Sequence, residues 1–290
     1  MLAKRMPGLL PDLSPADSLE VTAVHSLSGL LPADMPLVRR PPFVDPHHTA
    51  SAVSIIGGGT RGIRPGAMSL AHRGVLFMDE APEFASNVLD GLRQPLESGQ
   101  VVVARSTQTA IFPARFQLVL ASNPCPCGQG GSAASQCQCT PMMRRRYRDR
   151  ISGPIRDRID IHRTMTPPSR PELAAALASS RTSAELAGVV AEARERQASR
   201  LAGTSWLVNG DVPGVELRKR WPVTERARVA LDSQLRSHQL SARSADRVLG
   251  LSWTVADLRC RDVPDTDDVE LALALRRDTP LTPGLRELVA

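Results

Sequence analysis

The stretch GVLFMDE at 74–80 constrains the fold of this 290-residue chain more than any other. It is a continuous apolar run that ends in two carboxylates, a pattern typical of a parallel strand buried on both faces. A second such run, FQLVLASN at 116–123, ends in a polar asparagine. Two buried strands of this kind indicate a parallel sheet covered by helices, so we predict an α/β fold.

The segments around these strands predict local elements. NVLDGLRQPLESG at 87–99 has helical spacing and a glycine stop, and 101–114 has the pattern of a hairpin with its turn near 106–107. Residues 32–72 are rich in proline, glycine and histidine, which predicts a long insertion with one short helix near 53–56. The opening residues 1–13 are expected to be the end of a helix that a proline-rich turn stops.

From about Pro167 onward the patterns are helical. Apolar residues recur at helical spacing in four segments, at 184–200, 224–239, 241–258 and 266–278. We therefore predict an α/β core over residues 1–166, followed by an all-helical lid domain over 167–290.

The charge balance suits a polyanionic partner. The formal net charge is +6, as expected of a protein that binds nucleic acid or nucleotide, although arginine-rich proteins from GC-rich genomes are often basic without such a partner. No apolar run approaches the roughly 18 residues that a membrane span needs. Prolines interrupt the opening stretch, which excludes a signal peptide. We expect a cytoplasmic protein with no membrane partner.

The acids of GVLFMDE have the pattern of a Walker B motif, in which an apolar strand delivers an aspartate and then a glutamate. Asp79 would hold Mg²⁺, usually through water, and Glu80 would polarise the attacking water. The alternative is a buried strand that ends in solvated acids. Asn123, at the end of the next buried strand, would orient the lytic water, and its alternative is a simple turn former.

Two arginines are candidates for phosphate contacts. Arg158, in GPIRDRIDIH, would reach the γ-phosphate of a neighbouring subunit as an arginine finger, and its alternative is a local arginine–aspartate pair on the surface. Arg243 lies in the first turn of a predicted lid helix and would contact phosphate within its own subunit.

Four of the five cysteines lie in one short segment, which favours a metal site in a cytosolic protein. Two C-x-C pairs on a glycine-rich loop would converge on a structural Zn²⁺, with reduced, unliganded thiols as the alternative. The ligands would be Cys125, Cys127, Cys137 and Cys139. Cys260 stands apart, and we expect it in the core of the lid.

Basic segments offer candidate contacts with DNA. MMRRRYRDR at 142–150 follows a good helix start and would bind DNA phosphates, line a subunit interface or form a solvated helix face. Arg61 and Arg64 lie in the loop GGGTRGIRPG and would contact single-stranded DNA. His47 and His48 are adjacent and diverge in either regular structure, so hydrogen bonding is favoured over a shared metal.

Taken together, these segments resemble the ComM (YifB) family of magnesium-chelatase-like AAA+ ATPases, and the NPCPCG…CxCTP pair is the most specific part. The matching stretches are RRPPFVDPHHTAS, IIGGGTRGIRPGAMSLAHRGVLFMDEAPEF, VLDGLRQPLESGQVVVARS, FPARFQLVLASNPCPCG, CQCTP, ISGPIRDRIDIH and SARSADRVL. The resemblance implies a homo-hexameric ring that hydrolyses ATP with Mg²⁺ and acts on single-stranded or branched DNA, as a helicase promoting branch migration in natural transformation and recombination.

The resemblance also implies a role for each matching residue. Asp79 and Glu80 match Walker B, Asn123 matches sensor 1, Arg158 matches the arginine finger and Arg243 matches sensor 2. The loop carrying Arg61 and Arg64 and the hairpin carrying Arg105 match the pore-facing insertions of the family.

One departure concerns the phosphate-binding loop. The family carries GPPGTGKT directly before the residues that match Met1-Leu2-Ala3, and this sequence contains no GxxxxGK[ST]. We therefore expect a partial P-loop core whose parallel sheet lacks its first strand, and a chain that does not hydrolyse ATP by itself. Two alternatives remain open: a non-catalytic ring subunit or degraded fragment that donates Arg158 in trans, and a magnesium-chelatase ATPase subunit, against which the cysteine cluster argues.

Overall fold

The apolar run forms the central strand of a three-stranded parallel sheet. In the computed structural model, β4 (Val75–Met78) lies between β1 (Phe43–Val44) and β7 (Gln117–Leu120). All four residues of β4 are buried, as a strand covered on both faces requires. The predicted α/β class, a partial core followed by a helical region, is confirmed. The structure describes residues 2–32, 34–59, 62–105, 108–130, 136–168, 170, 181–282 and 284–285.

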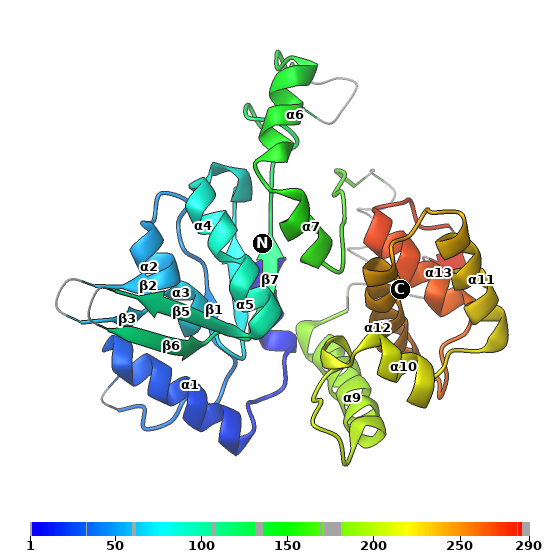
Figure 1. Ribbon diagram of the computed structural model, residues 1–290, viewed down its shortest axis with the longest axis horizontal. Helices are drawn as coiled ribbons and strands as arrows, with labels where there is room; N and C mark the ends of the chain where they lie inside the picture. The colour runs from blue at the N-terminus through cyan, green and yellow to red at the C-terminus, as the bar shows by residue number, and fades with distance from the viewer. Residues whose placement is uncertain are drawn as a thin grey trace. The chain divides into compact units, whose positions relative to one another are not determined.

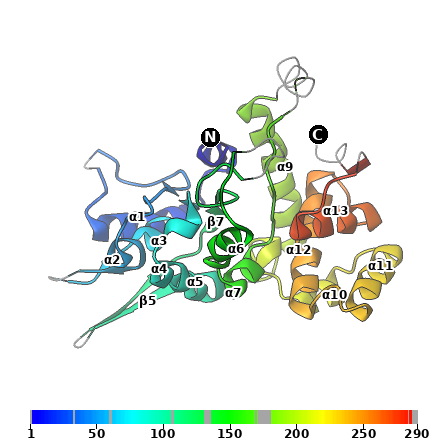
Figure 2. The ribbon, with the colours of Figure 1, turned by 90° about the horizontal axis from the view of Figure 1, so that it is seen from above.

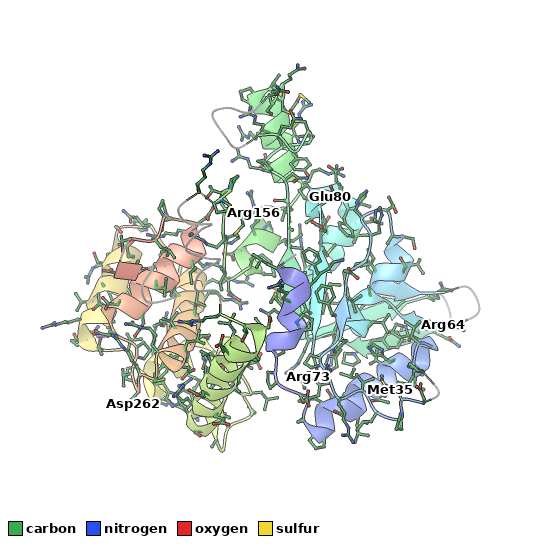
Figure 3. The ribbon with its side chains drawn as sticks, turned by 180° about the vertical axis from the view of Figure 1, so that it is seen from behind. Met35, Arg64, Arg73, Glu80, Arg156 and Asp262 are labelled. Atoms are coloured by element: carbon green, nitrogen blue, oxygen red, sulfur yellow. The ribbon has the colours of Figure 1, made fainter. Side chains whose placement is uncertain are left out.

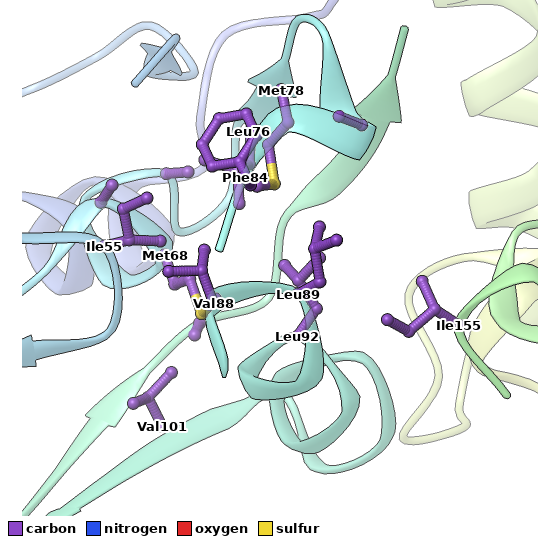
Figure 4. Packing of buried hydrophobic residues seen from close by; sticks show 14 residues of the cluster. Ile55, Met68, Leu76, Met78, Phe84, Val88, Leu89, Leu92, Val101 and Ile155 are labelled. Atoms are coloured by element: carbon purple, nitrogen blue, oxygen red, sulfur yellow. The ribbon is translucent and has the colours of Figure 1, made fainter. Parts of the chain in front are cut away.

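The chain divides into two compact units, Met1–Arg158 and Ile159–Ala290, which are described separately (Figure 1). In the first unit, short helices cover the sheet: α2 (Ala52–Ile56), α3 (Ala67–Leu70), α4 (Ser86–Gly91) and α5 (Arg93–Ser98). Their apolar side chains close around β4, and each fully buried Leu, Ile, Phe or Met contributes about 2 kcal/mol. This core contains Ile55, Met68, Leu76, Met78, Phe84, Val88, Leu89 and Leu92 (Figure 4).

The helix predicted over 87–99 is in fact two helices. α4 ends at Gly91 and α5 begins at Arg93. Pro95 explains the break, because its ring clashes with the carbonyl four residues earlier, at Gly91, and it has no N–H to donate. Gly99, in the left-handed conformation with φ 68°, ends α5 as the glycine stop predicted.

Two antiparallel hairpins accompany the sheet. β5 (Gln100–Ala104) pairs with β6 (Thr109–Pro113), which confirms the predicted hairpin; its predicted turn at 106–107 lies outside the described residues. Figure 2 shows this hairpin extending from the body of the unit. β2 (Gly57–Gly58) pairs with β3 (Arg64–Pro65).

The start of the chain holds a helix that the sequence patterns did not reveal. α1 (Pro15–Ser28) is capped by Ser14, whose hydroxyl accepts a hydrogen bond from the N–H of Asp17. Before it, the stretch expected to be the end of an α-helix forms the 3₁₀ helix η1 (Ala3–Leu9). The short helix expected near 53–56 is present as α2.

The second unit is a helical bundle with its own core. Its elements are α9 (Ser183–Leu201), η3 (Asn209–Asp211), α10 (Gly214–Arg220), α11 (Glu225–Arg236), α12 (Ala242–Leu258) and α13 (Thr266–Arg277). α12 is central and buries Val248, Leu249 and Trp253. All four predicted helices are present within a few residues of their expected ends, whereas α10 was not predicted. Among the described residues, no helix combines the length and the hydropathy of a membrane span.

The division of the chain by internal contacts falls after Arg158, whereas the sequence patterns place the start of the helical domain at 167. The segment from Ile159 packs with the helical unit, since the N–H of His162 donates to the Leu275 carbonyl at 2.8 Å. The N–H of Thr164 likewise donates to the Asp278 carboxylate at 2.7 Å. These bonds tie the connecting segment to α13, which is why the division by contacts falls after Arg158.

Candidate nucleotide site and cysteine cluster

Asp79 and Glu80 follow β4 directly, at the carboxyl end of the central strand, and Glu80 is labelled in Figure 3. The N–H of Ala81 donates to the Ala121 carbonyl at 2.8 Å, and the N–H of Ala121 donates to the Met78 carbonyl at 3.0 Å, so both acids sit on a fixed backbone. The Asp79 carboxylate accepts from the N–H of Glu80 at 3.0 Å. Asp79 is exposed and Glu80 half-buried, as acids at a ligand-binding sheet edge should be.

Glu80 adopts the left-handed conformation, with φ 51° and ψ 43°. This conformation costs a non-glycine residue roughly 1–2 kcal/mol, and such strain gathers at functional sites. It turns the chain sharply from β4 into the 3₁₀ helix η2 (Ala81–Glu83). The direction in which the Glu80 side chain leaves the chain is therefore set by this turn.

His48 contacts this glutamate, and the sequence patterns did not single out that contact. Its Nδ1 lies 3.1 Å from Glu80 Oε2, and its ring meets the edge of Phe84 at a centroid distance of 6.5 Å. His47 instead bonds Thr49, with Nδ1 2.8 Å from the hydroxyl. The two histidines therefore serve different partners, and only His48 reaches the candidate catalytic acid.

Asn123 lies at the same sheet edge as the two acids. β4 and β7 are parallel and in register from Val75↔Gln117 to Met78↔Leu120, so the residues that follow both strands emerge together. Asn123 is exposed there. The structure therefore brings Asp79, Glu80 and Asn123 to one edge, while their catalytic roles stay predictions.

Arg158 ends α7 (Gly153–Arg158) and is held within its own unit. Its guanidinium pairs with the Glu97 carboxylate of α5 and donates to the Pro154 carbonyl at 2.6 Å. Its side chain is only 10% exposed. A role as an arginine finger stays a prediction, and it requires Arg158 to reach a neighbouring phosphate from this paired position. Arg243, the predicted sensor 2, is exposed in the first turn of α12 in the second unit.

The basic residues of the two hairpins converge. Arg64 on β3 is exposed and pairs in register with Gly58 on β2. The guanidinium of Arg105, at the end of β5, lies beside the same glycine, 3.6 Å from where a Cβ of Gly58 would stand. Arg61 lies outside the described residues. Arg64 and Arg105 therefore belong to one basic surface, as a shared anionic ligand would require.

The four clustered cysteines converge as the spacing predicted. Cys125 Sγ lies 3.3 Å from Cys127 Sγ and 3.5 Å from Cys137 Sγ, and the four sulfurs including that of Cys139 all lie within 4.8 Å of one another. Four thiolates around one Zn²⁺ at about 2.3 Å would stand about 3.8 Å apart. The donor set and its spacing therefore fit a tetrahedral metal site.

The thiols also differ in acidity. Although desolvation opposes the shift, hydrogen bonds from Cys127, Cys137 and the N–H of Gly130 lower the pKa of Cys125 to about 6. Although the N–H of Gln129 favours its thiolate, the neighbouring thiols and desolvation raise the pKa of Cys127 to about 12. A thiolate is thus already favoured at Cys125, and the thiolate is the form that binds metals. Cys260 is exposed, so its expected place in the lid core was wrong.

Comparison with known proteins places these features in context. The sequence model described as magnesium chelatase, subunit ChlI, matches residues 1–173, and the ChlI C-terminal model matches residues 180–276. The chain is 44% identical over 277 residues to an uncharacterised protein of Mycobacterium tuberculosis, covering 96% of this chain and 54% of that protein.

The chain is also similar to the proteins YifB and ComM of two other bacteria. The chain is 38% identical over 290 residues to the uncharacterised protein YifB of Escherichia coli, covering 100% of this chain and 56% of that protein. It is 38% identical over 261 residues to the competence protein ComM of Haemophilus influenzae, covering 89% of this chain and 49% of that protein. The chain spans about half the length of the curated relatives it matches.

Proposed function

Because this chain belongs to the magnesium-chelatase-like AAA+ ATPase family that includes ComM and YifB, we propose that it forms the Walker B, sensor and lid part of an ATP-driven DNA motor. The observation that carries the proposal is the placement of Asp79 and Glu80 at the carboxyl end of a buried central strand. That is the edge at which α/β sheets bind their ligands.

In this proposal each residue at the carboxyl edge of the sheet has its own role in ATP hydrolysis. Family membership implies ATP and Mg²⁺, and the metal, when bound, neutralises charge that develops on the phosphates. Asp79 would hold the metal through its carboxylate. Glu80 would accept a hydrogen bond from the attacking water and draw its proton away, with His48 steadying the carboxylate from the other side. Asn123 would orient the same water through its amide.

The partner we propose is single-stranded or branched DNA, threaded through a homo-hexameric ring. Support comes from the shared basic surface of Arg64 and Arg105 and from the net charge of +6. The relative from Haemophilus influenzae is a competence protein, which supports a role in natural transformation and recombination. In such a ring Arg158 would act on the ATP of the neighbouring subunit, and Arg243 on that of its own.

A non-catalytic ring subunit is the second candidate. The 290-residue sequence contains no GxxxxGK[ST], and without such a loop the β- and γ-phosphates lack their backbone N–H cradle and their lysine. We therefore propose that this chain, taken alone, does not hydrolyse ATP.

Nucleotide binding tests both candidates. A fluorescent ATP analogue with Mg²⁺ would be titrated into the chain as given and into a version extended upstream of Met1 through a GPPGTGKT loop. We expect binding and hydrolysis by the extended version only. Tight binding by the chain itself would show that another segment cradles the phosphates. Failure of both to bind would contradict the ATPase proposal.

We further propose that the cysteine cluster holds one structural Zn²⁺. The support is the convergence of four sulfurs within 4.8 Å and the favoured thiolate at Cys125. Elemental analysis of the purified chain should find about one zinc per chain. A cluster free of metal, with all four thiols open to titration, would contradict it.

A further inference from the structure

The helix α6 (Pro141–Asp149) is the most basic element of the first unit. Its nine residues include the arginines 144, 145, 146 and 148 and a single acid, Asp149. Figures 1 and 3 show it standing out beyond the end of the sheet. The proposed function does not use this helix.

Both ends of α6 are anchored. At the start, Thr140 accepts from the N–H of Met143 and directly follows Cys139, so the cysteine cluster fixes the first turn. Arg144 adds a contact of 3.5 Å with the sulfur of Cys137. A helix so held presents its side chains in a fixed pattern, which lowers the entropy lost when a ligand binds them.

The other end is anchored beside the Walker B segment. Tyr147 is 5% exposed, and burial, followed by the charges of Glu83 and Glu80, raises the pKa of its hydroxyl. Just past the helix, Arg150 lies 3.6 Å from the Glu83 carboxylate and donates to the Phe84 carbonyl at 3.4 Å. These contacts hold one side of α6 against the protein and leave the opposite side to solvent.

The solvent side carries guanidinium groups with little competing negative charge. A helix turns about 100° per residue, so Arg145 lies nearly opposite Tyr147, and Arg148 is its neighbour one turn on. Within the described residues, Arg146 and Arg148 have no acidic partner. The acidic partner of Arg145 in the described part of the chain is Asp149, at 3.6 Å and with both side chains largely exposed, and such a pair adds little stability in water.

We infer that the outward face of α6 binds the phosphate backbone of nucleic acid, as a site separate from the surface of Arg64 and Arg105. The choice of partner rests on the proposed function. Guanidinium groups bind phosphate through paired hydrogen bonds and stay charged at any ordinary pH. The outward face carries no aromatic ring for bases to stack on, so binding is independent of sequence and falls steeply with salt.

The test measures the anisotropy of labelled 30-nucleotide single strands and duplexes with the purified chain, across a series of salt concentrations. The variant R145A/R148A removes two outward charges from α6. The control R226A/R236A removes two exposed arginines from α11 and causes the same change in net charge. We expect the α6 variant to lose about ten-fold in affinity, with a salt slope smaller by about 2, and the control to change less than about two-fold.

Further variants separate the outcomes. R145K/R148K, which keeps both charges, should retain most of the affinity. Equal losses in R145A/R148A and in the control, or no loss in either, would overturn the inference. If R64A/R105A weakens binding and R145A/R148A does not, the proposed DNA function stands and α6 is excluded. If R145A/R148A alters sedimentation of the extended protein without affecting DNA, α6 is a subunit contact instead. Circular dichroism of each variant establishes that the fold is kept.

Discussion

Glu80 combines a strained backbone with a half-buried carboxylate. The left-handed conformation sets the direction in which its side chain leaves the backbone, and Nδ1 of His48 lies 3.1 Å from its carboxylate. If Glu80 is the catalytic carboxylate, His48 would act on the reaction by positioning it.

The first prediction concerns the acid itself. In the extended version, E80Q should lower the rate of ATP hydrolysis by about 100-fold or more, because the amide cannot accept a proton from the attacking water. Binding of the ATP analogue should stay within about two-fold, since the role proposed for Glu80 is toward the attacking water and not toward the phosphates. Steady-state hydrolysis and titration with the analogue measure the two effects. An unchanged rate of hydrolysis in E80Q would contradict a catalytic role for Glu80.

The second prediction concerns His48. H48A in the extended version should lower kcat by about ten-fold with little change in KM, because the carboxylate loses a positioning partner and not a substrate contact. H48N, which can still donate to the carboxylate, should recover part of the rate. H47A is the matched control, as His47 bonds Thr49. Equal losses of kcat in H47A and H48A would show that both histidines act only by supporting the local chain around residues 47–49, and not through Glu80.

The sequence patterns predicted the two acids of this site but not the contact between His48 and Glu80. Asp79 and Glu80 follow an apolar run, and a local pattern of that kind is visible in a single stretch of chain. His48 reaches Glu80 because β1 pairs beside β4, and strand order is set by the packing of distant segments. The pairing of Arg158 with Glu97 was missed for the same reason, since α5 and α7 are far apart in sequence.

At the scale of elements, the helices of the second unit are joined by buried polar contacts. Arg200 of α9 donates to the Asp257 carboxylate of α12 through its two terminal guanidinium nitrogens, at 2.5 and 2.6 Å. The same carboxylate accepts from the Asn209 amide at 2.9 Å. Arg200 also lies over the ring of Trp253, at 4.1 Å from its centroid.

Removing this carboxylate should destabilise the unit strongly. D257A leaves the Arg200 charge, 12% exposed, without its ion-pair partner, so we expect a loss of about 3–5 kcal/mol in the free energy of unfolding. Urea unfolding followed by tryptophan fluorescence measures it. E192A, which breaks an exposed pair with Arg196, should cost less than about 1 kcal/mol. Similar costs for both variants would contradict a structural role for the buried pair.

In the first unit, His72 joins α1 to the base of the sheet. Its Nδ1 accepts from the N–H of Arg115 at 3.0 Å, so its Nε2 donates to Glu20 at 3.0 Å. Desolvation is the main cause of a lowered pKa at His72, despite the raising effect of the Glu20 hydrogen bond. The hydrogen bond from His72 is the main cause of a lowered pKa at Glu20.

Both shifts act in the same direction. A group whose pKa is lower in the folded state contributes stability above its unfolded pKa and loses it as pH falls. The stability of the first unit should therefore decrease as pH falls below about 6.5, where an unfolded histidine gains its proton. Urea unfolding from pH 8 to pH 5 measures the slope. H72Q should be less stable at pH 8 and should show a smaller decrease between pH 7 and pH 5.5.

The elements themselves were largely visible in the sequence. The helices of the second unit show amphipathic spacing and capping residues, so their positions follow from local chemistry. α1 was not predicted because its Ser14-Pro15 start lies in a proline-rich stretch, which favours a reading as loop. α4 and α5 were predicted as one helix because the spacing of apolar residues continues across the break that Pro95 imposes.

At the scale of the whole molecule, the two units have separate cores and separate optical probes. All three tryptophans, Trp206, Trp221 and Trp253, lie in the second unit, and the single tyrosine, Tyr147, lies in the first. Tryptophan fluorescence therefore reports on the second unit by itself.

We expect residues 159–290 to fold when expressed alone, because the described residues of their apolar core all lie within that range. Their urea unfolding curve by tryptophan fluorescence should coincide with that of the full chain, with midpoints within about 0.3 M. A shift much larger than this, or a non-cooperative curve, would show that the first unit contributes to the stability of the second.

The order of the central sheet also limits how quickly the first unit can form. β4 pairs with β1 through Val75↔Phe43 and with β7 through Val75↔Gln117. Each pairing closes a long loop, so the chain loses entropy before the strand contacts can stabilise the pair. The helices of the second unit form from local contacts instead. During synthesis from the N-terminus, the fully apolar β4 leaves the ribosome well before β7 and waits without that neighbour. In that interval the apolar side chains of Val75–Met78 lack the cover of β7, and we expect any chaperone dependence of the first unit to originate there.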